Sequence, residues 1–258
     1  MESRIGFDVE FQVETPDGSI ESFKGSPTST FKVDLASEIF APTPSAVLTP
    51  IDKICLAGAT REDCSTVSSA NWYNIYAYDG YTEGYVTVTV TASADYTVTA
   101  FRAYSGAKLY FEASTSFSVV ANQQVSVTMK LTISTSHNVY VYGGLPSVLS
   151  ASAKFLRGLI FDILKGARPP GAYLTLVWAV WGEETIALLG TGVTRTYTPG
   201  ATSGQISHPY TNFSSAGNLR YIRVNCEGAT ACISYVLTSA IAVTTSDRAS
   251  LTITINVT

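Results

Sequence analysis

Two sequence landmarks occur twice in this chain at one shared offset, and this duplication constrains the fold more than any other feature. Ser26 followed by Phe31, Leu35 and Ile39 returns as Ser150 followed by Phe155, Leu159 and Ile163. The alternating segment 127–133 returns as 251–257, again 124 residues later (31 to 155, 127 to 251). An equal offset for two different patterns indicates an internal repeat. The sequence therefore predicts two like domains in tandem, residues 1–134 and 135–258, each of ordinary domain size.

The opening of each half predicts a hairpin and then a helix. Residues 5–13 alternate apolar and polar side chains, and residues 16–18 (Pro-Asp-Gly) are typical of a hairpin turn. Ser26 as N-cap and Pro27 at the first helical position predict a helix that ends before Pro42. The second half repeats this plan with a shorter hairpin in 139–144 and a helix over 155–164, which ends at Gly166.

The rest of each half reads as short strands rich in aromatic and β-branched residues. They are expected at residues 72–78, 85–91, 96–104, 109–111 and 125–133, and in the second half at 173–181, 185–189, 194–197, 219–225, 233–237 and 251–257. His208 and Pro209 are assigned to a loop. The sequence thus predicts a mainly all-β fold of two tandem β-sandwich or jelly-roll-like domains, each with one short α-helix after the first hairpin.

The composition is unusually poor in charge. Charged residues make up 14% of the chain and hydrophobic residues 46%, whereas a typical soluble domain carries about a quarter charged residues. A surface built from hydroxyl groups and aromatic edges favours assembly with other proteins or a location outside the cytosol. The net charge of −4 and the scattered Lys and Arg argue against nucleic acid as a partner. No apolar run reaches the roughly 20 residues that would insert into a membrane, and the first residues lack the pattern of a signal peptide.

The four cysteines fall two in each half. Cys226 and Cys232 bracket a turn-like insert, so a hairpin would bring their sulfurs together. Cys55 and Cys64 form the matching pair in the first half. We expect two disulfides, with free thiols as the alternative, and metal ligation as a weaker one because zinc sites recur at close four-ligand spacing. Persistent disulfides imply an oxidising compartment or a hyperthermophile.

Catalytic patterns are scarce. The chain contains no glycine-rich phosphate loop, no metal-binding histidine pair and no nucleophile elbow. Asp52, Glu62 and Asp63 lie near the first cysteine pair and could hold a hard cation such as calcium, with a solvated polar loop as the favoured interpretation. We therefore expect no enzyme, no catalytic residue, no metal site and no cofactor.

Two segments are candidate interfaces. Residues 72–85 form the densest aromatic run, whose mixed period requires some rings to leave the core, where they can pack on the surface, form a subunit contact or stack on a glycan. The first strand places five apolar side chains on one face, which must be covered within the domain or by a neighbouring copy. The candidate interface residues are Ile5, Phe7, Val9, Phe11, Val13, Trp72, Tyr73, Tyr76, Tyr78, Tyr81 and Tyr85. Asn212 begins a glycosylation acceptor pattern in an expected loop.

The terminal strands leave two options open. Each carries apolar residues worth about 1.5–3 kcal/mol apiece on burial, so each must pair somewhere. Pairing within its own domain closes the sandwich, and pairing with a neighbouring copy is the strand donation found in pili. We favour closure of each terminal strand within its own domain, because each half contains both an opening and a closing strand.

The layout of an alternating hairpin, a short helix around residues 31–35 and a closing run over residues 118–131 is similar to virion surface and capsid proteins of viruses of hyperthermophilic archaea. The low-charge, Tyr/Thr/Val-rich composition also looks like archaeal extracellular filament subunits. The chain departs from thermophile proteins in lacking charged networks. The resemblance implies a structural protein of the particle or its appendages.

We therefore expect a self-assembling, non-enzymatic virion component, namely a capsid, turret or fibre protein of an archaeal virus. The alternatives are an extracellular pilus-like filament subunit joined by strand donation, and a receptor- or glycan-binding module. The expected partners are further copies of the chain or other virion proteins, with a host-surface glycan or receptor as the third. The expected location is the virion or an extracellular filament.

Overall fold

The first strand, β1 (Glu2–Glu14), is the strand around which the chain is organised. One of its edges pairs antiparallel with β9 (Gln124–Ser136) along residues 4–13. The other edge is shared. Near its start β1 pairs parallel with β17 (Arg248–Val257), and further along it pairs antiparallel with β2 (Ile20–Pro27). Strands from both ends of the sequence therefore meet on β1.

The computed structural model describes residues 2–14, 18–41, 47–78, 80–136, 156–168, 178–183, 186–187, 191–192, 194–212, 216–225 and 231–258. Its remaining elements in the first half are α1 (Ser29–Phe40), β3 (Lys53–Ala57), β4 (Glu62–Thr66), the short 3-10 helix η1 (Ser69–Asn71), β5 (Trp72–Ala77), β6 (Tyr81–Thr91), β7 (Tyr96–Ser105) and β8 (Lys108–Val119). The second half contributes helical residues 156–164, β10 (Trp178–Glu183), β11 (Ile186–Ala187), β12 (Thr191–Gly192), β13 (Thr194–Tyr197), β14 (Ser203–Asn212), β15 (Gly217–Asn225) and β16 (Ala231–Val243).

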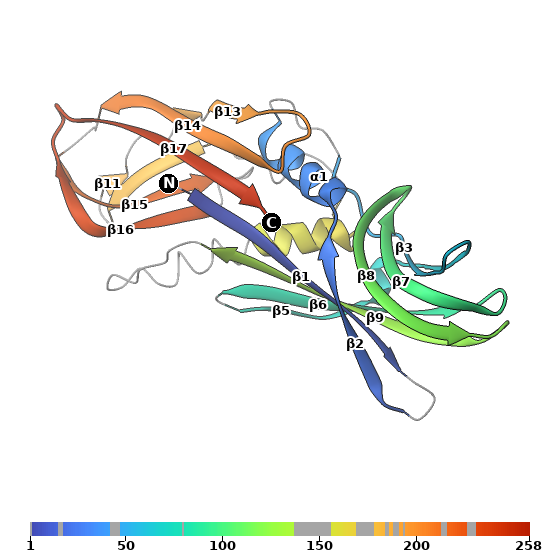
Figure 1. Cartoon of the computed structure of the whole chain (residues 1–258). Coiled ribbons are helices and arrows are strands. Elements are labelled where there is room, and N and C mark those ends of the chain that lie inside the picture. Colours follow the sequence, from blue (N-terminus) through green and yellow to red (C-terminus); the bar gives the residue numbers. More distant parts are fainter. Residues whose placement is uncertain are drawn as a thin grey trace.

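The fold is mainly β and sandwich-like, as the sequence predicts at that level. A 12-stranded mixed sheet follows the order β13-β14-β17-β1-β2-β8-β7-β3-β4, with β9, β6 and β5 continuing from the other edge of β1. Because β2 pairs first with β1 and then with β8, the sheet turns back on itself and forms two layers (Figure 1). A separate five-stranded sheet, β10–β12 with β15 and β16, belongs to the second half.

The core lies between the two layers and follows the period-two pattern of the strands. Ile5, Phe7, Val9, Phe11 and Val13 on β1 are all buried, and so are the inward residues of β9. The rings of Phe11 and Phe101 stack at 5.5 Å between centroids, which joins β1 to β7 across the core. The five β1 side chains proposed as a candidate interface are thus covered by residues of the same chain.

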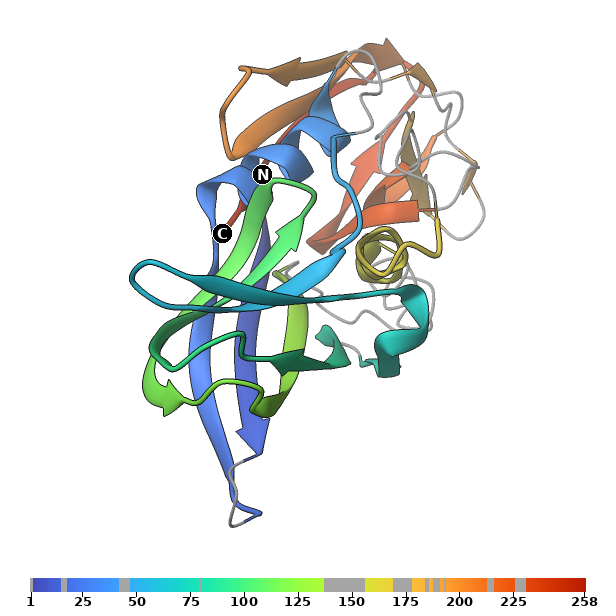
Figure 2. The same ribbon diagram turned by 90° about the vertical axis from the view of Figure 1, so that its right-hand side faces the viewer.

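The helix α1 lies between β8 and strands β13, β14 and β17, as Figures 1 and 2 show. Phe31, Leu35 and Ile39 are buried at the predicted helical spacing. The predicted N-cap is wrong. Ser26 and Pro27 continue β2 by pairing with β8, and Thr28 caps the helix by accepting a hydrogen bond from the Phe31 amide at 3.3 Å. The strand runs on because β8 offers it a partner up to Pro27.

The helical residues 156–164 pack against β5 and β6. Phe161 meets Trp72 edge to face at 6.0 Å between ring centroids, and a Cβ on Gly84 would approach the Phe161 ring to 2.9 Å. The fully buried Arg157 donates hydrogen bonds to the hydroxyls of Thr82 and Thr135 and to the carbonyl of Tyr78. This helix therefore ties the second half to the first.

The second half contains a strand, β14, where the sequence analysis expects a loop. His208 and Pro209, assigned to a loop, lie in β14, which pairs with β17. The register shifts between His208 and Thr211, because Pro209 has no amide hydrogen to give the ladder. The shortened hairpin over 139–144 lies outside the described residues. Of the helices in the described part of the chain, none combines the length and the apolar character needed to cross a bilayer.

Candidate functional site

The surface feature that stands out is a group of tyrosines on the β5–β6 hairpin. We define the tyrosine patch as Tyr73, Tyr76, Tyr78, Tyr81 and Tyr85. Four of these rings expose large fractions of their surface, 43% for Tyr73, 51% for Tyr76, 42% for Tyr78 and 38% for Tyr81. Among the described residues, the other large hydrophobic side chains this exposed are Ile20 and Val120. Contiguous exposed apolar surface of this kind marks interaction sites.

A β-bulge gives the patch its geometry. Strict alternation from the buried Trp72 would point Tyr76 into the core. The register of β5 on β6 shifts between Tyr73 and Tyr76, and Asn74 adopts a positive φ of 49°. The extra residue changes the phase, so that Ile75 packs against the core and Tyr76 faces solvent. The sequence prediction that some rings leave the core is explained by this bulge.

The rings of the patch stack on one another. Tyr73 lies directly opposite Tyr85 and stacks on it at 5.8 Å between centroids, and Tyr78 stacks on Tyr81 at 4.6 Å. Tyr76 is tilted against Tyr78 at 6.4 Å. Stacking covers one face of each ring and fixes the group before any partner arrives, which reduces the entropy lost on binding.

The charges at the patch cancel. Lys130 on β9 pairs with Glu83 on β6 at 3.1 Å and lies 5.5 Å from the centroid of the Tyr85 ring. The hydrogen bond to Glu83 raises the pKa of Lys130. Partial desolvation and then the charge of Glu83 raise the pKa of Tyr78, so its phenol is neutral at physiological pH. The patch therefore presents rings and hydroxyls without net charge.

The edge of β5 is less suited to binding than its face. β5 pairs with β6 alone among the described strands, so one row of its backbone groups is open. It is short, follows η1 directly and contains the bulge at Asn74. Short bulged edges resist pairing with another strand. A partner is therefore expected to contact the tyrosine rings rather than extend the sheet.

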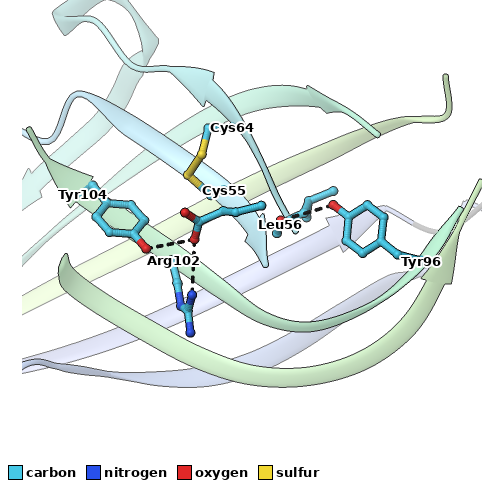
Figure 3. The surroundings of a disulfide bond; sticks show 7 residues. Cys55, Leu56, Cys64, Tyr96, Arg102 and Tyr104 are labelled. Atoms are coloured by element: carbon cyan, nitrogen blue, oxygen red, sulfur yellow. Dashed lines mark hydrogen bonds and ion pairs between the residues drawn. A yellow bond between two sulfur atoms is a disulfide. The ribbon is translucent and has the colours of Figure 1, made fainter. Parts of the chain in front are cut away.

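The first predicted disulfide is confirmed. Cys55 on β3 lies directly opposite Cys64 on β4, with an S–S distance of 2.04 Å (Figure 3). Glu62 lies close enough to the two sulfurs to form a ligand group with them, but metal binding there is blocked, because the sulfurs bind each other and Glu62 is held by Arg102 and Tyr104. Burial raises the pKa of Tyr104, whose hydroxyl donates to Glu62 at 2.8 Å.

The second cysteine pair cannot be placed, since Cys226 lies outside the described residues. The hairpin predicted around it is present as far as Asn225, which pairs with Ala231 across β15 and β16. Asn212 is the last residue of β14 rather than a loop residue, and the rest of its acceptor pattern lies outside the described part. These assignments stay predictions.

The three carboxylates near the first cysteine pair do not converge. Asp52 accepts a hydrogen bond from the Gly106 amide, Glu62 binds Arg102, and Asp63 accepts two hydrogen bonds from Ser93. Burial acts to raise the pKa of Asp63, but the hydrogen bonds from Ser93 and Tyr96 and the charge of Arg61 together lower it. Each carboxylate is thus engaged by a different neighbour, and the calcium alternative gains no geometric support.

A buried polar cluster under α1 is the other concentration of titratable groups. Asp34 accepts hydrogen bonds from Lys108 at 2.7 Å and from the Tyr110 hydroxyl at 2.9 Å, and Thr49 joins Tyr110 to Ser105. The cluster lies beside an open cleft of about 660 Å³. Its groups bind one another and fix the segment from Val47 to Pro50 against α1 and β8, which is what a structural network does.

Comparison with known proteins finds no matching family model, no significantly similar curated protein and no significantly similar solved structure.

Proposed function

We propose that this protein is a non-enzymatic, self-assembling structural subunit, a capsid, turret or fibre component of the virion of an archaeal virus. The observation that carries the proposal of assembly is the exposed, uncharged tyrosine patch on a chain with few surface charges. Tyr is enriched at protein interfaces and at their energetic centres. The assignment to a virion comes from the resemblance described above, and the first disulfide is compatible with a particle exposed to oxidising surroundings.

The size of the patch fits the central part of a subunit contact. Four rings exposed to the extents given above offer roughly 350 Å² in all, taking about 200 Å² for a whole aromatic side chain. A standard interface buries about 800 Å² on each partner, so the rings would supply close to half of it. The hydroxyl-bearing threonines of β6 and β9 beside the patch, such as Thr87 and Thr128, would supply the polar rim.

The patch also suits a contact between identical surfaces. In a two-fold interface each patch faces the same patch of the other copy, so any net charge on the patch would be repelled by the same charge across the contact. The Lys130–Glu83 pair removes that repulsion. We therefore propose that two copies associate through the tyrosine patch, and that other contacts extend the assembly.

The proposal is tested by the oligomeric state of the purified protein. Sedimentation velocity over a range of concentrations, with electron microscopy of the same samples, should show dimers or larger particles. The double variant Tyr76→Ser/Tyr81→Ser should shift the protein to monomer, because each substitution removes about 2 kcal/mol of apolar burial on both sides of a two-fold contact. Val120→Ser, which removes an exposed apolar side chain elsewhere, is the control and should leave association unchanged. A wild-type monomer at every concentration contradicts the proposal.

A receptor- or glycan-binding module is the second candidate, and the same exposed rings favour it, because tyrosines can stack on sugars. Self-stacking of the rings leaves fewer open ring faces for a sugar, which makes assembly the better supported function. A glycan that quenches tyrosine fluorescence in the wild type and not in Tyr76→Ser/Tyr81→Ser would favour the second candidate. Strand donation gains no such support, since β1 and β17 pair with strands of their own chain.

We further propose that the two halves descend from one duplicated unit. In support, Leu35 and Ile39 of α1 and Leu159 and Ile163 of the second helix are all buried at the repeated offset. The two repeated closing segments are also both strands, β9 and β17, and both pair with β1.

A further inference from the structure

The end of the sandwich formed by the β1–β2 hairpin is open. β2 pairs with β1 from Ile20 to Gly25 but with β8 at Ser26 and Pro27 alone. At Gly25 the two strands are still close, since a Cβ there would lie 3.2 Å from that of Ala113. Beyond that point β8 follows β7, and Figure 1 shows β2 and β8 separating toward the hairpin tip.

The separation leaves a cleft of about 580 Å³, in which apolar side chains are joined by the polar residues Ser118, Gln123, Gln124 and Ser126. Phe23 of β2 and Phe117 of β8 line it from the two layers, and Val13 and Val125 contribute from β1 and β9. Both phenylalanines pack against the buried Phe101, at 5.4 Å and 5.8 Å between centroids, so the floor of the cleft is continuous with the core. The volume lies within the range of ligand sites of about 300–1,000 Å³.

One wall of the cleft is an open strand edge. Within the described residues, β2 has no partner on the side away from β1 between Ile20 and Lys24. Its pairing with β1 runs without a bulge from Glu14 opposite Ile20 to Val9 opposite Gly25. A regular open edge beside a partly apolar cleft is the arrangement used by proteins that bind an extended peptide as an added strand.

The mouth of the cleft is acidic. Glu14 and Glu21 line it, and its lining includes no Lys or Arg. Glu21 lies opposite Val13, on the same side of β2 as Phe23, so a carboxylate occupies a position whose neighbours face the core. A positively charged side chain on a strand added beside β2 could pair with the Glu21 carboxylate across the two strands. The site therefore favours a positively charged group next to apolar ones.

From this geometry we infer that the open end binds an extended segment of a partner protein, which pairs with the free edge of β2. Its side chains toward the cleft are apolar at alternate positions and include one Lys or Arg opposite Glu21. This surface is separate from the tyrosine patch, so the inference stands whether or not the patch mediates assembly.

The test uses short capped peptides that alternate threonine with valine, one valine being replaced by lysine, and follows binding by fluorescence anisotropy. The wild type should bind the lysine peptide at least about tenfold more tightly than the same peptide with glutamate, which corresponds to about 1.4 kcal/mol of binding free energy. Glu21→Lys should invert that order. Asp8→Lys, the same charge change at an exposed position of β1 outside the cleft, should leave it unaltered.

Two further measurements separate strand pairing from simple pocket filling. A peptide N-methylated along one edge keeps its side chains but loses the hydrogen bonds of an added strand, and it should bind at least about tenfold more weakly. Phe117→Ser should weaken the lysine and glutamate peptides alike. Equal binding of the N-methylated peptide, an unchanged preference in Glu21→Lys, or no binding of any peptide to the wild type would each overturn the inference.

Discussion

Replacing Arg157 by methionine should destabilise the protein by about 3 kcal/mol. The guanidinium is fully buried and donates to Thr82 at 3.0 Å, to Thr135 at 2.6 Å and to the Tyr78 carbonyl at 2.7 Å. Methionine fills much of the same volume but donates no hydrogen bond. Tyr78 is exposed and Thr135 half-buried, so the Tyr78 carbonyl and the Thr135 hydroxyl can form hydrogen bonds with water instead. Thr82 is 1% exposed, so its hydroxyl cannot.

The magnitude follows from these contacts. A buried hydroxyl left without its partner costs about 1–3 kcal/mol, and the imperfect fit of the new side chain adds about 1 kcal/mol. A loss of about 3 kcal/mol corresponds to a decrease in Tm of roughly 6–12 °C for a chain of this size. Urea unfolding followed by tryptophan fluorescence measures it, since Trp72 packs on Phe161 of the same helix.

Two companion variants make the reasoning refutable. Arg157→Met combined with Thr82→Val removes both partners of the buried hydrogen bond and should recover about 1–2 kcal/mol of the loss. Arg168→Met makes the same exchange just after the helix, where Arg168 pairs with Asp162 at the surface, and should cost under about 1 kcal/mol. The reasoning fails when Arg157→Met costs no more than Arg168→Met, or when the double variant is less stable than the single one.

Three other predictions follow from particular contacts. Cys55→Ala/Cys64→Ala, or a reductant, should lower the free energy of unfolding by about 2–3 kcal/mol in urea titrations, and an unchanged midpoint would contradict the role given to this disulfide. Gly204→Ala should cost about 1–3 kcal/mol, because its Cβ would overlap the Phe40 ring, while Gly80→Ala, with no atom within 4 Å, should stay within about 0.5 kcal/mol in the same titration. Burial raises the pKa of Tyr110, so the folded state favours the neutral phenol; this contribution is complete below the unfolded-state pKa of about 10 and is lost as pH rises above it. The urea midpoint should therefore decrease as the pH is raised beyond about 10, and it should decrease less steeply with pH in Tyr110→Phe than in the wild type. An equal decrease in both proteins would show that Tyr110 is not the cause.

The parts of the fold that the sequence predicts are those set by local periodicity. The alternation of β1 and the helical spacing of Phe31, Leu35 and Ile39 each leave one arrangement that buries the apolar side chains, and the structure adopts it. The burial of Asp34 could not be predicted in this way. It depends on Lys108 and Tyr110, which reach α1 from a strand more than 70 residues away.

For the same reason, the candidate site could be predicted from the sequence only in part. Composition indicates that rings between Trp72 and Tyr85 leave the core, but the bulge at Asn74 decides which ones do. Asparagine tolerates a positive φ better than most residues, so an Asn between aromatic residues that break the alternation is the signal that could have located the bulge. The cleft at the open end carries no local signal, because it exists only where β2 and β8 diverge.

The pairing of β17 bears on how copies can assemble. β2 reaches β1 only from Val9 onward, which leaves the edge of β1 at residues 2–5 open to another strand. β17 fills it in parallel, and the Thr258 amide adds a hydrogen bond to the Ile5 carbonyl. In pili the strand that completes a sheet comes from a neighbouring subunit. Here β17 completes the edge of β1 within the same chain. With that edge occupied, the proposed contacts between copies are expected on faces such as the tyrosine patch, and the proposed strand from a partner is expected at the edge of β2.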